Sequence, residues 1–142
     1  MIYASDSEIR YSVSHINYVN TNIIYKRDNM TDKIKLENKT VVIKDWGWEE
    51  IFADKNCMYR GKVLFINKGK GFHLQRHKSK DETLYIAKGK GILRFNGDAI
   101  EVKKGDSFRF KPGDIHKLIA IEDLMIFEVA NSIPDSDVEH LE

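Results

Sequence analysis

The sequence is short of cysteine, of net charge and of long apolar runs. Cys57 is the only cysteine in 142 residues, so no disulfide can form within the chain. A lone cysteine favours a reducing compartment, and we expect a cytoplasmic protein. No stretch approaches 18 apolar residues, and the first ten residues lack the basic and apolar parts of a signal peptide, so no membrane association is expected.

The balance of positive and negative residues argues against a strongly charged binding partner. Lys and Arg number 23 against 22 Asp and Glu, which gives a formal net charge of +1. Proteins that bind nucleic acid or anionic membranes usually carry a clear excess of basic residues, so neither is expected as the main partner. The length suits one domain that buries enough surface to fold without disulfides.

Helical periodicity is also lacking. Short segments rich in Val, Ile, Phe and Tyr follow one another and are bounded by Gly, Asn, Asp and Lys, which predicts β-strands. The expected strands cover residues 40–46, 48–53, 58–67, 72–77, 82–88, 91–96, 99–103, 107–111, 116–122 and 124–130. Asn96-Gly97 predicts a tight hairpin turn. Many strands with no helices between them indicate an antiparallel sandwich or barrel.

The two ends of the chain fit this pattern less well. Residues 1–32 form an expected N-terminal extension with strands at 9–19 and 22–26, and residues 33–142 form the barrel domain, with a first strand at 33–37. The extension has two interpretations: a strand exchanged with a second subunit, or an edge hairpin on the same barrel. The C-terminal segment 132–142 is expected to be irregular and on the surface.

Four polar side chains form a candidate metal site. Gln75 and His77 are two residues apart, so a strand directs both to one face. Glu82 shares its parity with apolar residues of the next strand, and His116 comes from a distant strand. Such nitrogen and oxygen donors suit a divalent metal (Zn, Mn, Fe, Ni or Co). The alternative is a polar pocket without a metal.

Two spaced motifs contain these residues and resemble the cupin motifs. The first runs from Gly69 to Gly89 and has Gln75 in place of the usual first His. The second runs from Gly105 to His116 and departs from the motif at Lys111, where Pro is usual. The resemblance implies an all-β fold, the cupin jelly roll, which is a double-stranded β-helix barrel.

A narrower resemblance covers residues 40–142. Trp-Gly at 46–47, Leu-Gln-Arg-His at 74–77 and the Pro-Gly segment at 112–118 are similar to the C-terminal cupin domain of type II mannose-6-phosphate isomerase/mannose-1-phosphate guanylyltransferase proteins. The His-rich run that follows the ligand His in that family is replaced here by residues 78–80. This resemblance implies a homodimer that acts as an aldose–ketose isomerase on a sugar phosphate.

Further residues receive roles under this hypothesis. His73 or Lys80 would move the proton, although a core histidine and a solvated lysine are the simpler interpretations. Arg109 and Lys111 would bind the phosphate, unless they are ordinary surface charges. Trp46 would pack in the core or stack on a sugar. Alternative functions are a non-catalytic cupin that binds a sugar or metabolite, and a small metal-dependent oxygenase.

Overall fold

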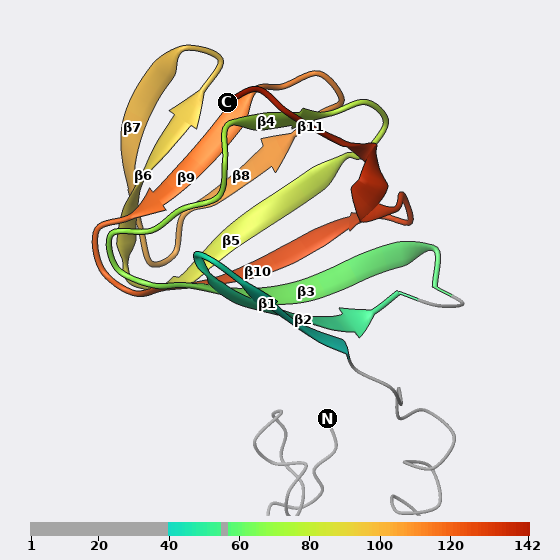
Figure 1. The fold of residues 1–142 in the computed structure, drawn as a ribbon, viewed down its shortest axis with the longest axis horizontal. Helices are drawn as coiled ribbons and strands as arrows, with labels where there is room; N and C mark the ends of the chain where they lie inside the picture. The colour runs from blue at the N-terminus through green and yellow to red at the C-terminus, as the bar shows by residue number, and fades with distance from the viewer. Residues whose placement is uncertain (1–39, 55–56) are drawn as a thin grey trace, which may run out of the picture. The chain divides into compact units, whose positions relative to one another are not determined.

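Antiparallel strands dominate the computed structural model, which describes residues 40–54 and 57–142 (Figure 1). The strands are β1 (Thr40–Lys44), β2 (Gly47–Ala53), β3 (Tyr59–Ile66), β4 (Gln75–His77), β5 (Glu82–Lys88), β6 (Lys90–Phe95), β7 (Asp98–Lys103), β8 (Ser107–Phe110), β9 (His116–Ala120), β10 (Leu124–Asn131) and β11 (Val138–His140). The strands expected at 9–19, 22–26 and 33–37, and the boundary at residue 33, lie outside the described residues. Within the described ranges no helix is long and apolar enough to cross a bilayer.

The strands form two sheets. One has the order β1-β2-β3-β10-β5-β8, and the other has the order β11-β4-β9-β6-β7. Every pairing between the described strands is antiparallel. Consecutive strands often lie in different sheets, as β3 and β4 do, so the chain crosses repeatedly between the layers (Figure 1). The predicted all-β jelly roll is therefore confirmed.

The space between the sheets is filled by strand residues of one parity. In β10, Leu124, Ile126 and Ala130 are buried and alternate with more exposed residues. Leu84 and Ile86 of β5 follow the same rule. A strand directs alternate side chains to opposite faces. Because buried residues alternate with more exposed ones in these strands, one face of their sheet is buried and the other is more exposed to solvent.

The hairpin predicted at Asn96-Gly97 is present between β6 and β7. Asn96 has φ 47° and Gly97 has φ 102°. Two successive positive φ angles are what a tight hairpin turn requires, and Asn and Gly adopt them most readily.

The C-terminal segment differs from the expectation. Instead of being irregular, it forms a 3-10 turn, η2 (Asp135–Asp137), and then β11, which pairs with β4. The backbone N–H of Leu141 donates to the carbonyl of Leu74, and Arg76 pairs with Glu139. The prediction was wrong because the acidic tail has no apolar pattern of its own. It is held by β4 and by ion pairs with distant strands.

Two glycines with positive φ provide a test of this packing. Gly89 has φ 90° and a Cβ there would lie 2.1 Å from the carbonyl oxygen of Asp123, whereas Gly105 has φ 98° with nothing within 4 Å of a Cβ. We expect Gly105→Ala to lower the free energy of unfolding by about 1 kcal/mol through backbone strain alone. Gly89→Ala adds a clash with fixed backbone and should cost about 2–5 kcal/mol. Urea denaturation of both variants measures the difference, and equal losses would contradict the close approach at Gly89.

Candidate metal centre

The four predicted ligand residues come from three strands whose inner faces meet. Gln75 and His77 lie on β4, Glu82 begins β5 and His116 begins β9. Gln75 pairs directly with His116 across the sheet, while Glu82 belongs to the opposite sheet. His77, Glu82 and His116 are each at most 5% exposed. Strand parity predicts this inward direction for Gln75, His77 and Glu82, and the structure adds His116 to the same interior.

The polar atoms of these residues converge. Glu82 Oε1 lies 3.2 Å from His116 Nε2 and 3.5 Å from His77 Nε2. Gln75 Nε2 lies 3.5 Å from His116 Nε2. One ligand atom from each of His77, Glu82 and His116 falls within 4.8 Å of the other two. Two imidazoles, a carboxylate and an amide therefore surround one point inside the barrel.

The chemistry of this cluster fits a divalent cation. Both ring nitrogens of His77 are buried and have no hydrogen-bond partner among the described residues. Leaving a buried polar group without a partner costs about 1–3 kcal/mol, and a metal bond would satisfy one of these nitrogens. The second ring nitrogen of His116, Nδ1, lies 3.1 Å from the Asp114 carbonyl oxygen. An oxygen partner at this distance fixes the orientation of a ring that binds a metal. Asp137 Oδ2 lies 3.9 Å from His77 Nδ1, which is too far for a hydrogen bond.

The electrostatics keep the carboxylate ionised. Burial raises the pKa of Glu82, but the rings of His116 and His77 and the ammonium of Lys80 outweigh burial and hold the pKa well below its usual range. An ionised carboxylate is the form that binds a metal.

Lys80 does not have the environment of a general base. Its Nζ lies 2.8 Å from both Glu82 Oε2 and Glu128 Oε1, and its side chain is 3% exposed. Burial lowers the pKa of Lys80, but the charges of Glu128 and Glu82 overcome this and raise it above its ordinary value. A general base must be able to lose its proton near neutral pH. The geometry therefore counts against the proton-transfer role expected for Lys80 and makes it a fixed cation.

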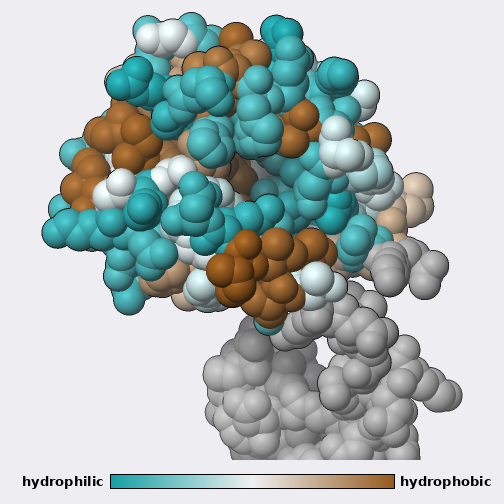
Figure 2. All heavy atoms as spheres, viewed as in Figure 1, coloured by the Kyte–Doolittle hydropathy of each residue, from teal (hydrophilic) through white to brown (hydrophobic). Residues whose placement is uncertain are grey.

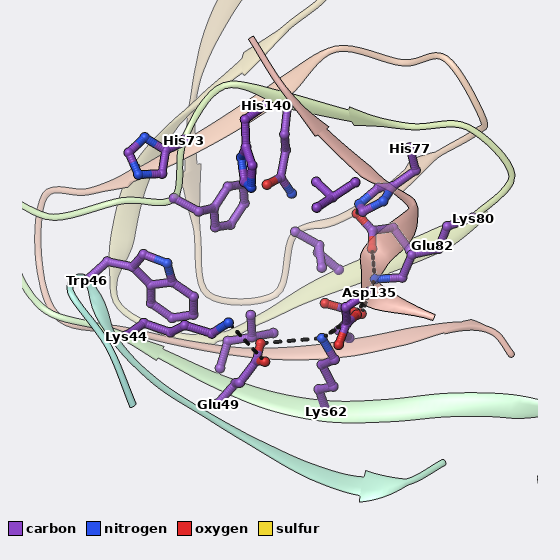
Figure 3. Close-up of a pocket in the computed structure, with 16 residues that line it drawn as sticks. Lys44, Trp46, Glu49, Lys62, His73, His77, Lys80, Glu82, Asp135 and His140 are labelled. Carbon is purple, nitrogen blue, oxygen red and sulfur yellow. Dashed lines mark hydrogen bonds and ion pairs between the residues drawn. The ribbon is translucent and has the colours of Figure 1, made fainter. Parts of the chain in front are cut away.

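A cavity of about 200 Å³ opens beside the cluster (Figure 3). Several of the charged residues that line it were not identified as site residues from the sequence. Lys62 Nζ contacts Glu49 at 3.3 Å and Asp135 at 3.0 Å, and Lys44 Nζ lies 3.5 Å from Glu49. Together with Glu128 these residues form the charged wall of the cavity. The signal was present in the sequence, since Lys62 and Glu128 have the parity of the buried residues on β3 and β10.

The cavity mouth is formed by residues of mixed character. Figure 2 shows a hollow on this face with mostly hydrophilic residues around it. Trp46, His73 and His140 line the cavity. The ring centroids of His73 and His140 lie 5.6 Å apart, in an edge-to-face arrangement. His73 is exposed, so it is not the core histidine of the alternative interpretation. Trp46 belongs to the hydrophobic core and also faces the cavity.

The two expected phosphate ligands lie elsewhere. Arg109 is on β8 between Phe108 and Phe110, which point inward, so its own side chain points outward. It makes a two-point ion pair with Asp81. Lys111 is exposed, and neither basic residue lines the cavity. At these positions neither residue faces this cavity, and a role of either residue as a phosphate ligand stays a prediction.

These observations define a class: a jelly-roll barrel with a mixed His, Glu and Gln cluster at the inner end of a small cavity. The sequence model described as "Cupin domain" matches residues 62–129, the segment that contains all four cluster residues. This match and the two-sheet topology support placing the chain in the cupin superfamily. Cupins commonly bind a divalent metal, in keeping with the cluster.

Known proteins resemble this chain over part of their length. The uncharacterized protein MJ1618 of Methanocaldococcus jannaschii is 30% identical over 69 residues, which are 49% of this chain and 55% of that protein. The structure of KdgF from Halomonas sp. has a TM-score of 0.62 at 16% identity and covers 70% of this chain and 90% of that one. The capsular polysaccharide assembling protein CapF of Staphylococcus aureus has a TM-score of 0.62 at 22% identity and covers 74% of this chain and 34% of that one. At these identities the structural likeness shows the fold alone.

The unpartnered nitrogens of His77 generate a prediction about stability. A divalent metal at 100 times its dissociation constant should add about 2.7 kcal/mol to the free energy of unfolding of the wild type. His77→Leu removes one metal ligand and should abolish most of that gain. His140→Leu is the matched control, since His140 lines the cavity without belonging to the cluster. Thermal denaturation with and without zinc or cobalt measures each gain, and an equal gain in His77→Leu would contradict the assignment.

Proposed function

We propose that this protein holds a divalent cation at Gln75, His77, Glu82 and His116 and binds a small polyhydroxylated molecule, a sugar or sugar derivative, in the adjoining cavity. The observation that carries the proposal is the convergence of these four side chains at a cavity lined by hydrogen-bonding groups. A divalent cation would supply a Lewis acid for a hydroxyl or carbonyl oxygen of the ligand.

The charges of the cavity support an uncharged ligand over a phosphorylated one. Lys62 and Lys80 are buried and each bridges two carboxylates, and the more exposed Lys44 lies 3.5 Å from Glu49. A phosphate would therefore compete with existing carboxylate partners for every ammonium of the lining. Three ammonium groups face four carboxylates, which leaves a formal charge of −1 before any metal is bound. One divalent cation changes this to +1. Neutral hydroxyl groups suit such a balanced wall, because they can both donate and accept hydrogen bonds.

The shape of the cavity supports the same class of ligand. A volume of about 200 Å³ accommodates a small molecule and excludes the body of a polymer. The indole of Trp46 provides one apolar wall, while His73 and His140 provide polar groups. Pockets of this kind combine an apolar surface with a few placed polar groups that select the ligand. Among the fold relatives, CapF is named for capsular polysaccharide assembly, which is compatible with a carbohydrate ligand.

Aldose–ketose isomerisation is the second candidate. It is favoured by His73 and His140, whose rings meet at the cavity mouth, because a histidine is the side chain best suited to move a proton at neutral pH. In this case His73 would take a proton from one ligand carbon and deliver a proton to the adjacent carbon, while Gln75 and Glu82 would keep their places beside the ligand oxygens. Specificity for mannose 6-phosphate, the homodimer and the alternative oxygenase function stay predictions.

The binding proposal predicts metal-dependent recognition of free sugars. Zinc- or cobalt-loaded wild type should bind at least one member of a panel of hexoses, pentoses and sugar acids, and the metal-free protein should bind it at least tenfold more weakly. Isothermal titration calorimetry measures both affinities. Arg109→Ala is the matched control, since its partner Asp81 lies outside the cavity. Failure of the loaded protein to bind any sugar would count against the proposed ligand class.

The isomerase candidate predicts exchange of a carbon-bound proton. Metal-loaded protein should exchange the C2 proton of its sugar with deuterium from solvent. Loss of a general base typically slows such a step about 100-fold or more, so His73→Gln should show this loss. Because Gln keeps a polar group at the cavity mouth, the affinity for the sugar should fall far less than the rate of exchange. Proton NMR of the sugar follows the exchange. Binding without any exchange in the wild type would leave the non-catalytic sugar-binding function.

A further inference from the structure

The two carboxylate oxygens of Glu82 have different partners. Oε1 faces the cluster, at 3.2 Å from His116 Nε2 and 3.5 Å from His77 Nε2. Oε2 faces away and lies 2.8 Å from the ammonium of Lys80 (Figure 3). A charge-assisted hydrogen bond of this length fixes the rotation of the carboxylate plane. Only one oxygen is thus left for the point on which the imidazoles converge.

The ammonium that holds Oε2 is itself held at several points. Lys80 Nζ donates to Glu128 Oε1 at 2.8 Å and has Asp135 Oδ1 at 3.7 Å. The backbone N–H of Lys80 donates to Asp137 Oδ2 at 3.0 Å. Since the side chains of Lys80, Glu82 and Glu128 are at most 6% exposed, water has little access to these bonds. Glu128, Lys80 and Glu82 therefore form a rigid buried chain with one end at the cluster.

We propose that Lys80 is a positioning residue of the candidate metal centre: by holding Glu82 Oε2 it makes Glu82 a ligand that binds through one oxygen only. This inference rests on the proposed metal binding. Calcium takes six to eight oxygen ligands and often uses both oxygens of a carboxylate. A site with two imidazoles, one amide and a single carboxylate oxygen suits first-row transition metals instead. Lys80 thereby biases the choice of metal.

A simple charge effect predicts the opposite result. The ammonium of Lys80 repels a nearby cation, so its removal would strengthen metal binding if charge were its only influence. Removing Lys80 and Glu128 together takes away one positive and one negative charge and leaves the formal charge of the cavity unchanged. Any loss of affinity in that pair variant then reports the lost orientation of Glu82.

The test is metal binding by Lys80→Met/Glu128→Gln, measured by titration with cobalt, zinc and calcium. We expect cobalt and zinc affinities to fall about 10- to 100-fold, as is typical when an outer partner of a metal ligand is lost. We also expect the ratio of zinc to calcium affinity to fall and the visible spectrum of bound cobalt to change, because Glu82 can then use both oxygens.

The matched control is Lys62→Met/Glu49→Gln. It removes an equivalent buried ion pair from the same wall, at 3.3 Å, and neither residue contacts Glu82 in the described structure. This control should stay within about threefold of the wild type for each metal and keep the cobalt spectrum. Equal losses in both pair variants, or no loss in Lys80→Met/Glu128→Gln, would overturn the positioning role.

A measurement on the wild type covers the case in which the pair variant does not fold. In a crystal structure of the zinc- or cobalt-loaded protein, Glu82 should contact the metal through Oε1 alone, with Oε2 still on Lys80. Contact through both oxygens, with Lys80 displaced, would overturn the inference and leave the proposed function standing. A wild type that binds no divalent cation would instead overturn the proposed function and the inference that rests on it.

Discussion

Charges buried inside the barrel have to be paired, and the structure around the candidate site depends on this constraint. An unpaired ion in a protein interior loses its hydration, and breaking a buried pair typically costs about 3–5 kcal/mol. Here Lys80 bridges Glu82 and Glu128, and Lys62 bridges Glu49 and Asp135. Asp135 comes from the C-terminal segment, so that segment is part of the cavity wall and supplies one of the carboxylate partners of Lys62.

The same strands supply both the dry core and the charged cavity. On β3 the inward residues change from Lys62 to Leu64 and Ile66, and on β5 they change from Glu82 to Leu84. The inner face is therefore charged at one end of the barrel and apolar at the other. Packing at the apolar end stabilises the fold and offsets the cost of burying charges at the other end, where a ligand could bind. Strand parity also explains why outward residues such as Arg109 do not line the cavity.

Pairing has consequences for recognition. Turning Lys80 toward a phosphate would cost free energy, because buried Glu82 and Glu128 would lose the ammonium that they share. A cation bound beside Gln75, His77, Glu82 and His116 would change the charge of the cavity without breaking any of these pairs. Metal and hydroxyl-rich ligand would thus complement a wall whose own charges are already satisfied, which distinguishes this site from one built to hold an anion.

The sequence by itself predicted the strands from β1 to β10, the hairpin at Asn96-Gly97 and the inward direction of Gln75, His77 and Glu82. It did so because alternation and turn chemistry are local properties of the chain. It failed where the structure depends on partners far along the chain, since the 132–142 segment was expected to be irregular. It also gave no sign that Lys80, which was named with His73 as a candidate base, bridges two buried carboxylates.

Only the tertiary structure decided those roles. It placed Glu128 and Glu82 on either side of one ammonium, and it paired β11 with β4. Ion pairs between residues 48 positions apart, such as Lys80 and Glu128, leave no periodic mark in a sequence. Their energy comes from the low dielectric of a closed barrel, which exists only after both sheets have packed.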